Sequence, residues 1–111
     1  MFKISRDKNH FIVSFYNTNR VNCFLVEELS KQLSLFLNTP GCELSINFEG
    51  IDFIDSSGFN FLMILYEKAK EHGFKYRLCH VSDEVRELFS RTDLADRIME
   101  YADVISNKPC P

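Results

Sequence analysis

The chain has 111 residues, and its 13 Lys and Arg against 16 Asp and Glu give a formal net charge of −3. This length fits one domain with a single hydrophobic core. The composition, 45% hydrophobic and 26% charged, excludes a disordered chain. The acidic balance argues against nucleic-acid binding. The apolar stretch 59–66 is far shorter than the about 20 residues of a membrane-spanning helix. We therefore expect no membrane insertion. We also expect a cytoplasmic protein that is monomeric when free.

The four cysteines form no C-x-x-C pair, and the three histidines are dispersed. This spacing argues against a zinc site or a redox motif, so we expect reduced thiols, no metal and no cofactor.

The first half of the chain predicts a hairpin followed by a helix. Residues 2–5 and 10–15 are typical of two short strands joined by a polar turn. From residue 22 on, leucines recur at helical spacing, which predicts a helix over about 21–37. The polar residues 17–19 offer caps for this helix.

The second half alternates strands and helices. Gly73 is placed to end one helix and Ser82 to cap the next. The predicted elements are strands at 43–48, 75–80 and 97–101 and helices at about 57–72 and 83–91. This alternation predicts an α/β fold, a mixed four- to five-stranded sheet with helices packed on it. We expect one domain over residues 1–105 and a flexible tail over 106–111.

The most informative stretch is the start of the second long helix, which reads Asp55, Ser56, Ser57 and Gly58. Any of the first three side chains could cap the helix. A helix amino terminus carries unpaired N–H groups and the positive end of the helix dipole. A serine there could therefore carry a phosphate without unfolding the domain. The glycine would let another chain approach the backbone closely.

The sequence Ile-Asp-Phe-Ile-Asp-Ser-Ser-Gly at 51–58 resembles the signature of the STAS domain family, whose best-known members are bacterial anti-sigma factor antagonists. The similarity continues through the following apolar helix, Gly73, the strand that ends near His80 and the segment 82–89. It covers roughly residues 2–105 and implies a STAS fold.

The resemblance also implies a partner switch. In that family a GHKL-type serine kinase, itself an anti-sigma factor, phosphorylates the serine directly after the Asp. A PP2C-like phosphatase removes the phosphate, and the unphosphorylated form binds the partner. Carried onto this chain, the phosphoacceptor is Ser56, with Ser57 as a minor alternative and supporting residue. Asp55 would orient the hydroxyl or help hold the metal-bound nucleotide of the kinase, and Gly58 would support the site.

We expect the partner to bind near this helix start, at Asp52, Phe53, Phe59, Asn19, Arg20 and Asn22. Antagonists of the family often carry Gly-Glu-Leu-Asp before the first helix, whereas this chain has Asn19-Arg20-Val21-Asn22. Arg20 thus replaces the Glu and Asn22 replaces the Asp. This departure leaves open which partner is bound and whether a sigma factor is involved.

Other functions are weighed against this one. A constitutive STAS adaptor subunit of an ABC lipid-transport complex would not need the acceptor serine. A partner switch could also regulate biofilm or exopolysaccharide production without a sigma factor. No P-loop, G-x-G-x-x-G or catalytic triad pattern is present, and Asp52 and Asp55 fit a loop and a helix cap better than an acid–base pair. We therefore do not expect an enzyme.

Overall fold

The computed structural model describes residues 1–36 and 41–91. The described strands are β1 (Phe2–Asp7), β2 (His10–Phe15), β3 (Arg20–Val21), β4 (Glu43–Asn47), β5 (Phe53–Ile54) and β6 (Lys75–Cys79). The described helices are α1 (Cys23–Leu33), α2 (Ser56–His72) and α3 (Asp83–Ser90). The strand expected at 97–101 and the tail expected at 106–111 lie outside the described residues.

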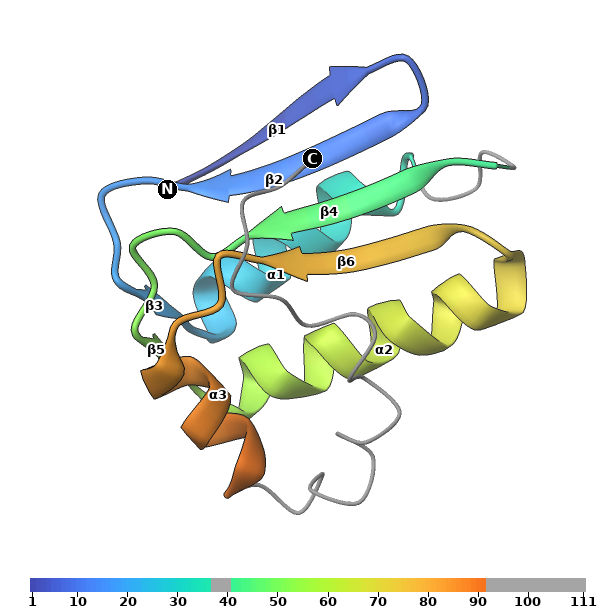
Figure 1. Ribbon diagram of the computed structural model, residues 1–111. Coiled ribbons are helices and arrows are strands. Elements are labelled where there is room, and N and C mark those ends of the chain that lie inside the picture. Colours follow the sequence, from blue (N-terminus) through green and yellow to red (C-terminus); the bar gives the residue numbers. More distant parts are fainter. Residues whose placement is uncertain (37–40, 92–111) are drawn as a thin grey trace.

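The main sheet has the strand order β1-β2-β4-β6. β1 runs antiparallel to β2, and the β2–β4 and β4–β6 pairs are parallel. The opening hairpin and the mixed four-stranded sheet are therefore as predicted. The helices α1 and α2 pack against one face of this sheet and against each other, and α3 contacts β5 (Figure 1).

The core forms because two periodicities meet. In β4 the side chains of Leu44 and Ile46 lie on the same face of the strand and are fully buried, and Ser45 on the opposite face is buried as well. In α1 the residues Leu25, Leu29 and Leu33 form the buried stripe, at the spacing that places side chains on one helix face. The face of the sheet and the stripe of the helix thus close on one hydrophobic core.

The helix α1 is shorter than the predicted 21–37. It begins later because Val21 belongs to β3, and the side chain of Asn22 caps the helix by accepting a hydrogen bond from the Leu25 nitrogen at 3.1 Å. The cap expected at 17–19 is therefore wrong. The helix ends at Leu33, and Ser34 is its C-cap.

The short strands β3 and β5 form a second, two-stranded parallel sheet that the sequence did not predict. Arg20 lies opposite Phe53, and Val21 lies opposite Ile54. The Asp55 nitrogen also donates to the Val21 carbonyl at 3.1 Å. This pair joins the segments that precede α1 and α2, so both helices begin at the same end of the molecule (Figure 1).

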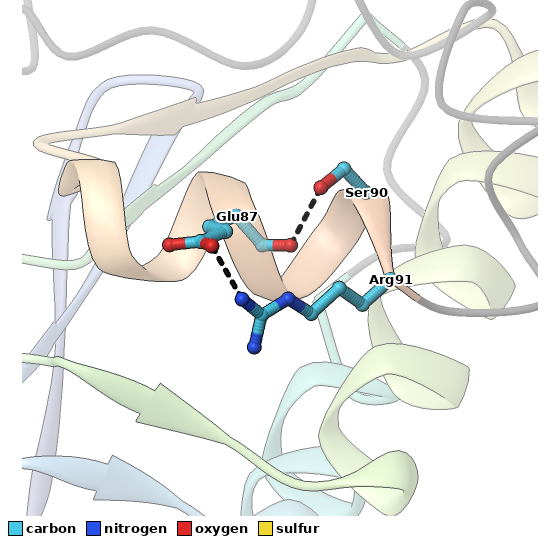
Figure 2. A network of polar contacts seen from close by, with 3 residues as sticks. All are labelled: Glu87, Ser90 and Arg91. Atoms are coloured by element: carbon cyan, nitrogen blue, oxygen red, sulfur yellow. Dashed lines mark hydrogen bonds and ion pairs between the residues drawn. The ribbon is translucent and has the colours of Figure 1, made fainter.

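The predicted caps of the other helices are confirmed. Gly73 ends α2 in the left-handed conformation, with φ of 73°. Ser82 caps α3 by accepting from the Val85 nitrogen at 3.2 Å. The last turn of α3 is closed by two contacts to Glu87 (Figure 2): Ser90 donates to its carbonyl oxygen at 2.7 Å, and Arg91 pairs with its carboxylate.

The cysteines follow the reduced-thiol prediction only in part. Cys23 and Cys42 are free thiols, whereas Cys79 is disulfide-bonded, so the prediction is wrong for that residue. Within residues 1–36 and 41–91, no group of His, Cys, Asp and Glu is arranged to hold a metal ion. No helix of the same part of the chain is long and apolar enough to cross a membrane.

Candidate functional site

At the start of α2, one residue caps the helix and the next residue is exposed to solvent. The Asp55 carboxylate accepts a hydrogen bond from the Gly58 nitrogen at 2.9 Å, which makes Asp55 the cap. Ser56, the first residue of the helix, is exposed. No residue among those described hydrogen-bonds its side chain, so the Ser56 hydroxyl is open to solvent and to a reacting group.

Ser57 lies in a different environment from Ser56. It is half-buried and lines a groove of about 250 Å³ between α1 and α2. Cys23 and Glu27 form the α1 side of this groove, and Asn60 lies on the α2 side. The more accessible of the two adjacent serines is therefore Ser56.

Gly58 packs against its own chain, and the expectation that it admits another chain is wrong. The residue is buried. A Cβ atom placed on it would collide with the Ile54 side chain and would lie 3.2 Å from Val21 Cγ1 and 3.3 Å from the Val21 carbonyl oxygen. The glycine is needed because α2 begins in direct contact with β3 and β5.

The small β3–β5 sheet brings four of the predicted partner-binding residues together. Asn19 and Arg20 lie on one segment, and Asp52 and Phe53 lie on the other. The Asn19 carbonyl accepts a hydrogen bond from the Asp52 nitrogen at 2.9 Å. The Arg20 guanidinium lies 5.7 Å from the centre of the Phe53 ring, within the range of a cation–π contact. All four residues are exposed, so they form one surface, called here the β3–β5 surface.

The other two predicted partner-binding residues are placed differently. Phe59 is only 5% exposed, and its ring meets Phe89 edge to face at a centroid distance of 4.8 Å. It is a core residue because it lies on the α2 face that packs against α3, so the expected exposed anchor at this position is wrong. Asn22 is half-buried, and its side-chain oxygen is used by the cap of α1.

Two exposed residues that sequence reasoning missed adjoin this end of the molecule. Cys23 and Phe24 form the first turn of α1, and Phe24 is 78% exposed. The signal was present in the periodicity, since Phe24 falls outside the buried stripe of Leu25, Leu29 and Leu33.

Elsewhere in the molecule, a serine contacts a histidine, which is a pairing also found in catalytic sites. His10 and Ser45 share a hydrogen bond of 2.7 Å, and the Glu43 carboxylate lies 4.0 Å from the other ring nitrogen. Ser45 is fully buried, so a substrate cannot reach its hydroxyl. At the start of α2 the exposed Ser56 hydroxyl has no histidine partner among the described residues.

The comparisons with known proteins give one family match and several solved structures of similar fold. The STAS domain family matches residues 5–107. An anti-sigma-factor antagonist (STAS) domain protein from Planctomyces limnophilus superimposes with a TM-score of 0.71 at 20% identity, over 86% of this chain and 83% of the other. The anti-sigma factor antagonist SpoIIAA in its unphosphorylated form gives 0.73 at 16% identity, over 95% and 85%.

A transporter contains the same fold. The murine anion transporter Slc26a9, in its inward-facing state, superimposes with a TM-score of 0.68 at 14% identity, over 91% of this chain and 16% of the transporter. No curated protein matches the chain in sequence. At these identities the structural matches establish the fold.

Proposed function

Because the chain belongs to the STAS domain family, we propose that it is a regulatory binding protein of the anti-sigma factor antagonist type. Its partner is exchanged by phosphorylation of Ser56. A GHKL-type serine kinase adds the phosphate and also serves as the partner of the unphosphorylated form, and a PP2C-like phosphatase removes the phosphate. The chain itself is not an enzyme.

One observation carries this proposal: Ser56 is exposed and unbonded, while Asp55 caps the helix. A serine used as a cap would have to give up its hydrogen bond to become a phosphoacceptor. Because capping is done by the neighbouring carboxylate, the Ser56 hydroxyl can be modified without loss of the cap. Ser57, which is half-buried in the groove, is the minor alternative acceptor.

The electrostatics of the helix start support a switch without unfolding. Phosphorylation adds a charge of about −1.5 to −2. The amino end of α2 favours negative charge through its dipole, so the free domain tolerates the phosphate. A partner docked over Ser56 would have to bury that charge beside Asp55 and near the exposed Asp52, and this cost would release it. The partner then contacts the β3–β5 surface, with Asp55 and Gly58 maintaining the shape of the helix start.

The family fold also favours a second candidate. Because a transporter contains a similar domain, the chain could be a constitutive adaptor, for example in an ABC lipid-transport complex. A switch that controls biofilm or exopolysaccharide production without a sigma factor uses the same chemistry as the first proposal and differs only in its partner.

The test compares two charge states of Ser56 as bait in native cells. Ser56→Ala should retain the partner, and Ser56→Asp should lose it. Asn9→Asp is the matched control because it adds the same charge in the exposed β1–β2 turn. Capture by Ser56→Ala and by Asn9→Asp, together with loss by Ser56→Asp, supports the switch. Phosphosite mapping of the unmutated protein from the same cells should find phosphate on Ser56.

Two results would redirect the proposal. Phosphate on Ser57 alone would move the acceptor by one residue. Equal capture by all three variants, with no phosphate found, would favour the constitutive adaptor.

A further inference from the structure

Arg20 carries a charge that no other described residue neutralises. Its guanidinium lies 5.7 Å from the centre of the Phe53 ring, and Phe53 is 43% exposed. Among the described residues Arg20 forms no ion pair, although Asp52 and Asp55 belong to the neighbouring segment. The Asp55 carboxylate is used by the cap of α2. An exposed cation–π contact is weak, so a stronger acceptor within reach can take the guanidinium from the ring.

The backbone places Ser56 within reach of Arg20. Phe53 lies opposite Arg20 in the parallel β3–β5 pair, and Ser56 follows Phe53 by three residues. At about 3.3 Å per residue and about 4.8 Å between strands, the α-carbons of Arg20 and Ser56 lie no more than about 11 Å apart. The residue after Arg20 fixes this approach, because the Val21 carbonyl accepts a hydrogen bond from the Asp55 nitrogen at 3.1 Å. An arginine side chain and a phosphoserine side chain can together span this gap.

A phosphate is a better partner for this guanidinium than the groups around it. Phosphorylation gives Ser56 a charge of about −1.5 to −2 and three acceptor oxygens. The planar guanidinium of Arg20 can donate two parallel N–H bonds to such oxygens, and charge-assisted bonds are about twice as strong as neutral ones. The single charge of a carboxylate does not hold Arg20, since neither Asp52 nor Asp55 pairs with it.

We infer that Arg20 binds the phosphate: when Ser56 is phosphorylated, the Arg20 guanidinium moves from the Phe53 ring to the phosphate. The inference rests on the proposed acceptor and adds the route by which the phosphate alters the β3–β5 surface. In the unphosphorylated chain this surface presents a cation beside an aromatic ring. In the phosphorylated chain the cation is neutralised and the Phe53 ring is uncovered. A partner that binds the first arrangement therefore meets a different surface as well as a new negative charge.

The test observes the phosphate itself, by phosphorus NMR titration of the full chain with genetically encoded phosphoserine in place of Ser56. A neighbouring cation stabilises the doubly charged phosphate and so lowers its second pKa from the ordinary value of about 6. This pKa should be lower in the parent chain than in Arg20→Ala by about 0.2–0.7, as for one exposed ion pair. Arg20→Lys should recover part of the difference, because Lys keeps the charge but loses the planar guanidinium. The carboxylates of Asp52 and Asp55 act in every chain, so the comparison removes their effect.

Arg6 supplies a matched control. Its guanidinium lies 5.3 Å from the centre of the Phe11 ring, which is the same kind of contact. Both residues lie near the β1–β2 turn, away from the start of α2 (Figure 1). Arg6→Ala should therefore leave the pKa of the phosphate unchanged. On phosphorylation the Arg20 Nε–H signal should move, and the Arg6 Nε–H signal should not.

Three results would overturn the inference. The first is an equal phosphate pKa in the parent chain and Arg20→Ala, and the second is an Arg20 Nε–H signal that does not move on phosphorylation. The third is a rise of the phosphate pKa in Arg86→Ala instead of Arg20→Ala, since Arg86 lies on α3, which contacts β5. The phosphate is introduced without a kinase, so none of these results depends on whether cells phosphorylate Ser56. Failure of this inference is therefore distinguishable from failure of the proposed switch.

Discussion

The Asp55 carboxylate accepts a hydrogen bond from the Gly58 nitrogen at 2.9 Å, and this contact leaves the intervening Ser56 free of any capping duty. Asp55 therefore stabilises the start of α2, whereas the side chain of Ser56, the first residue of the helix, takes no part in the cap. The Ser56 side chain can therefore be changed without loss of the hydrogen bond between Asp55 and Gly58.

The first prediction separates these two roles by stability. Asp55→Ala should lower the free energy of unfolding by about 0.5–2 kcal/mol, because the Gly58 nitrogen loses its partner. Ser56→Ala should change it by no more than about 0.5 kcal/mol, as for an exposed residue without bonds. Urea unfolding followed by circular dichroism measures both, and Asp55→Asn, which keeps a capping oxygen, should recover most of the loss. An equal cost for Asp55→Ala and Ser56→Ala would show that the serine shares the cap.

The second prediction concerns the tight contact under Gly58. Gly58→Ala should destabilise the chain by about 1–3 kcal/mol, because the new methyl group meets Ile54 and Val21. The cost should be smaller in an Ile54→Ala background, where space has been made. A double-mutant cycle on urea unfolding should therefore give a coupling of about 0.5–3 kcal/mol between the two positions. Strictly additive effects would show that the destabilisation caused by Gly58→Ala does not come from contact with the Ile54 side chain.

Elements with long periodic patterns or strong terminal residues were predicted from the sequence, and elements of only two residues were not. The helices α2 and α3 were predicted, with Gly73 as the end of α2 and Ser82 as the cap of α3, because these residues carry strong terminal preferences. The sequence left the cap at the start of α2 open between Asp55, Ser56 and Ser57. The strands β3 and β5 were missed because a two-residue strand has no period to detect.

The candidate site was predicted in part for the same physical reasons. The candidate serines and the three possible caps lie within one continuous motif, so local sequence was enough to name them as candidates but not to choose the cap. Which phenylalanine is exposed depends on packing against distant elements: Phe53 lies at the surface beside Arg20, whereas Phe59 is covered by Phe89 of α3. A local pattern does not contain that information.

The third prediction concerns pH. Burial raises the pKa of the Cys42 thiol, which favours its neutral form in the folded chain. In the unfolded chain this thiol ionises at its ordinary value, so unfolding releases a proton once the pH exceeds that value. The contribution of Cys42 to stability is therefore present at neutral pH and is lost as the pH rises from the unfolded towards the raised folded pKa.

Urea unfolding at several pH values, for the parent chain and for Cys42→Ala, checks this sign. The parent chain should lose more stability than the variant as the pH rises above about 8.5, the ordinary thiol value. The comparison with the variant removes the contribution of other groups that titrate in this range. The same slope in both chains would contradict the prediction.

The fourth prediction tests the contact between Arg20 and Phe53. An exposed cation–π pair contributes about 0.5–1 kcal/mol, so a double-mutant cycle of Arg20→Ala and Phe53→Leu should give a coupling of that size. Arg20→Lys should retain part of it, because Lys keeps the charge but loses the planar guanidinium. Zero coupling would mean that the two side chains form the β3–β5 surface without stabilising each other.

The β3–β5 pair also has a consequence for the order in which the site is built during folding. It joins segments that are far apart in the sequence and forms only a few backbone hydrogen bonds. These few bonds offset only a small part of the entropy that is lost when the long loop between the segments closes. Such contacts form late and open early, before the main sheet loses its hydrogen bonds. Because Val21 and Ile54 of this pair belong to the hydrophobic core, opening of the β3–β5 pair would expose the edge of the core that lies beside the start of α2.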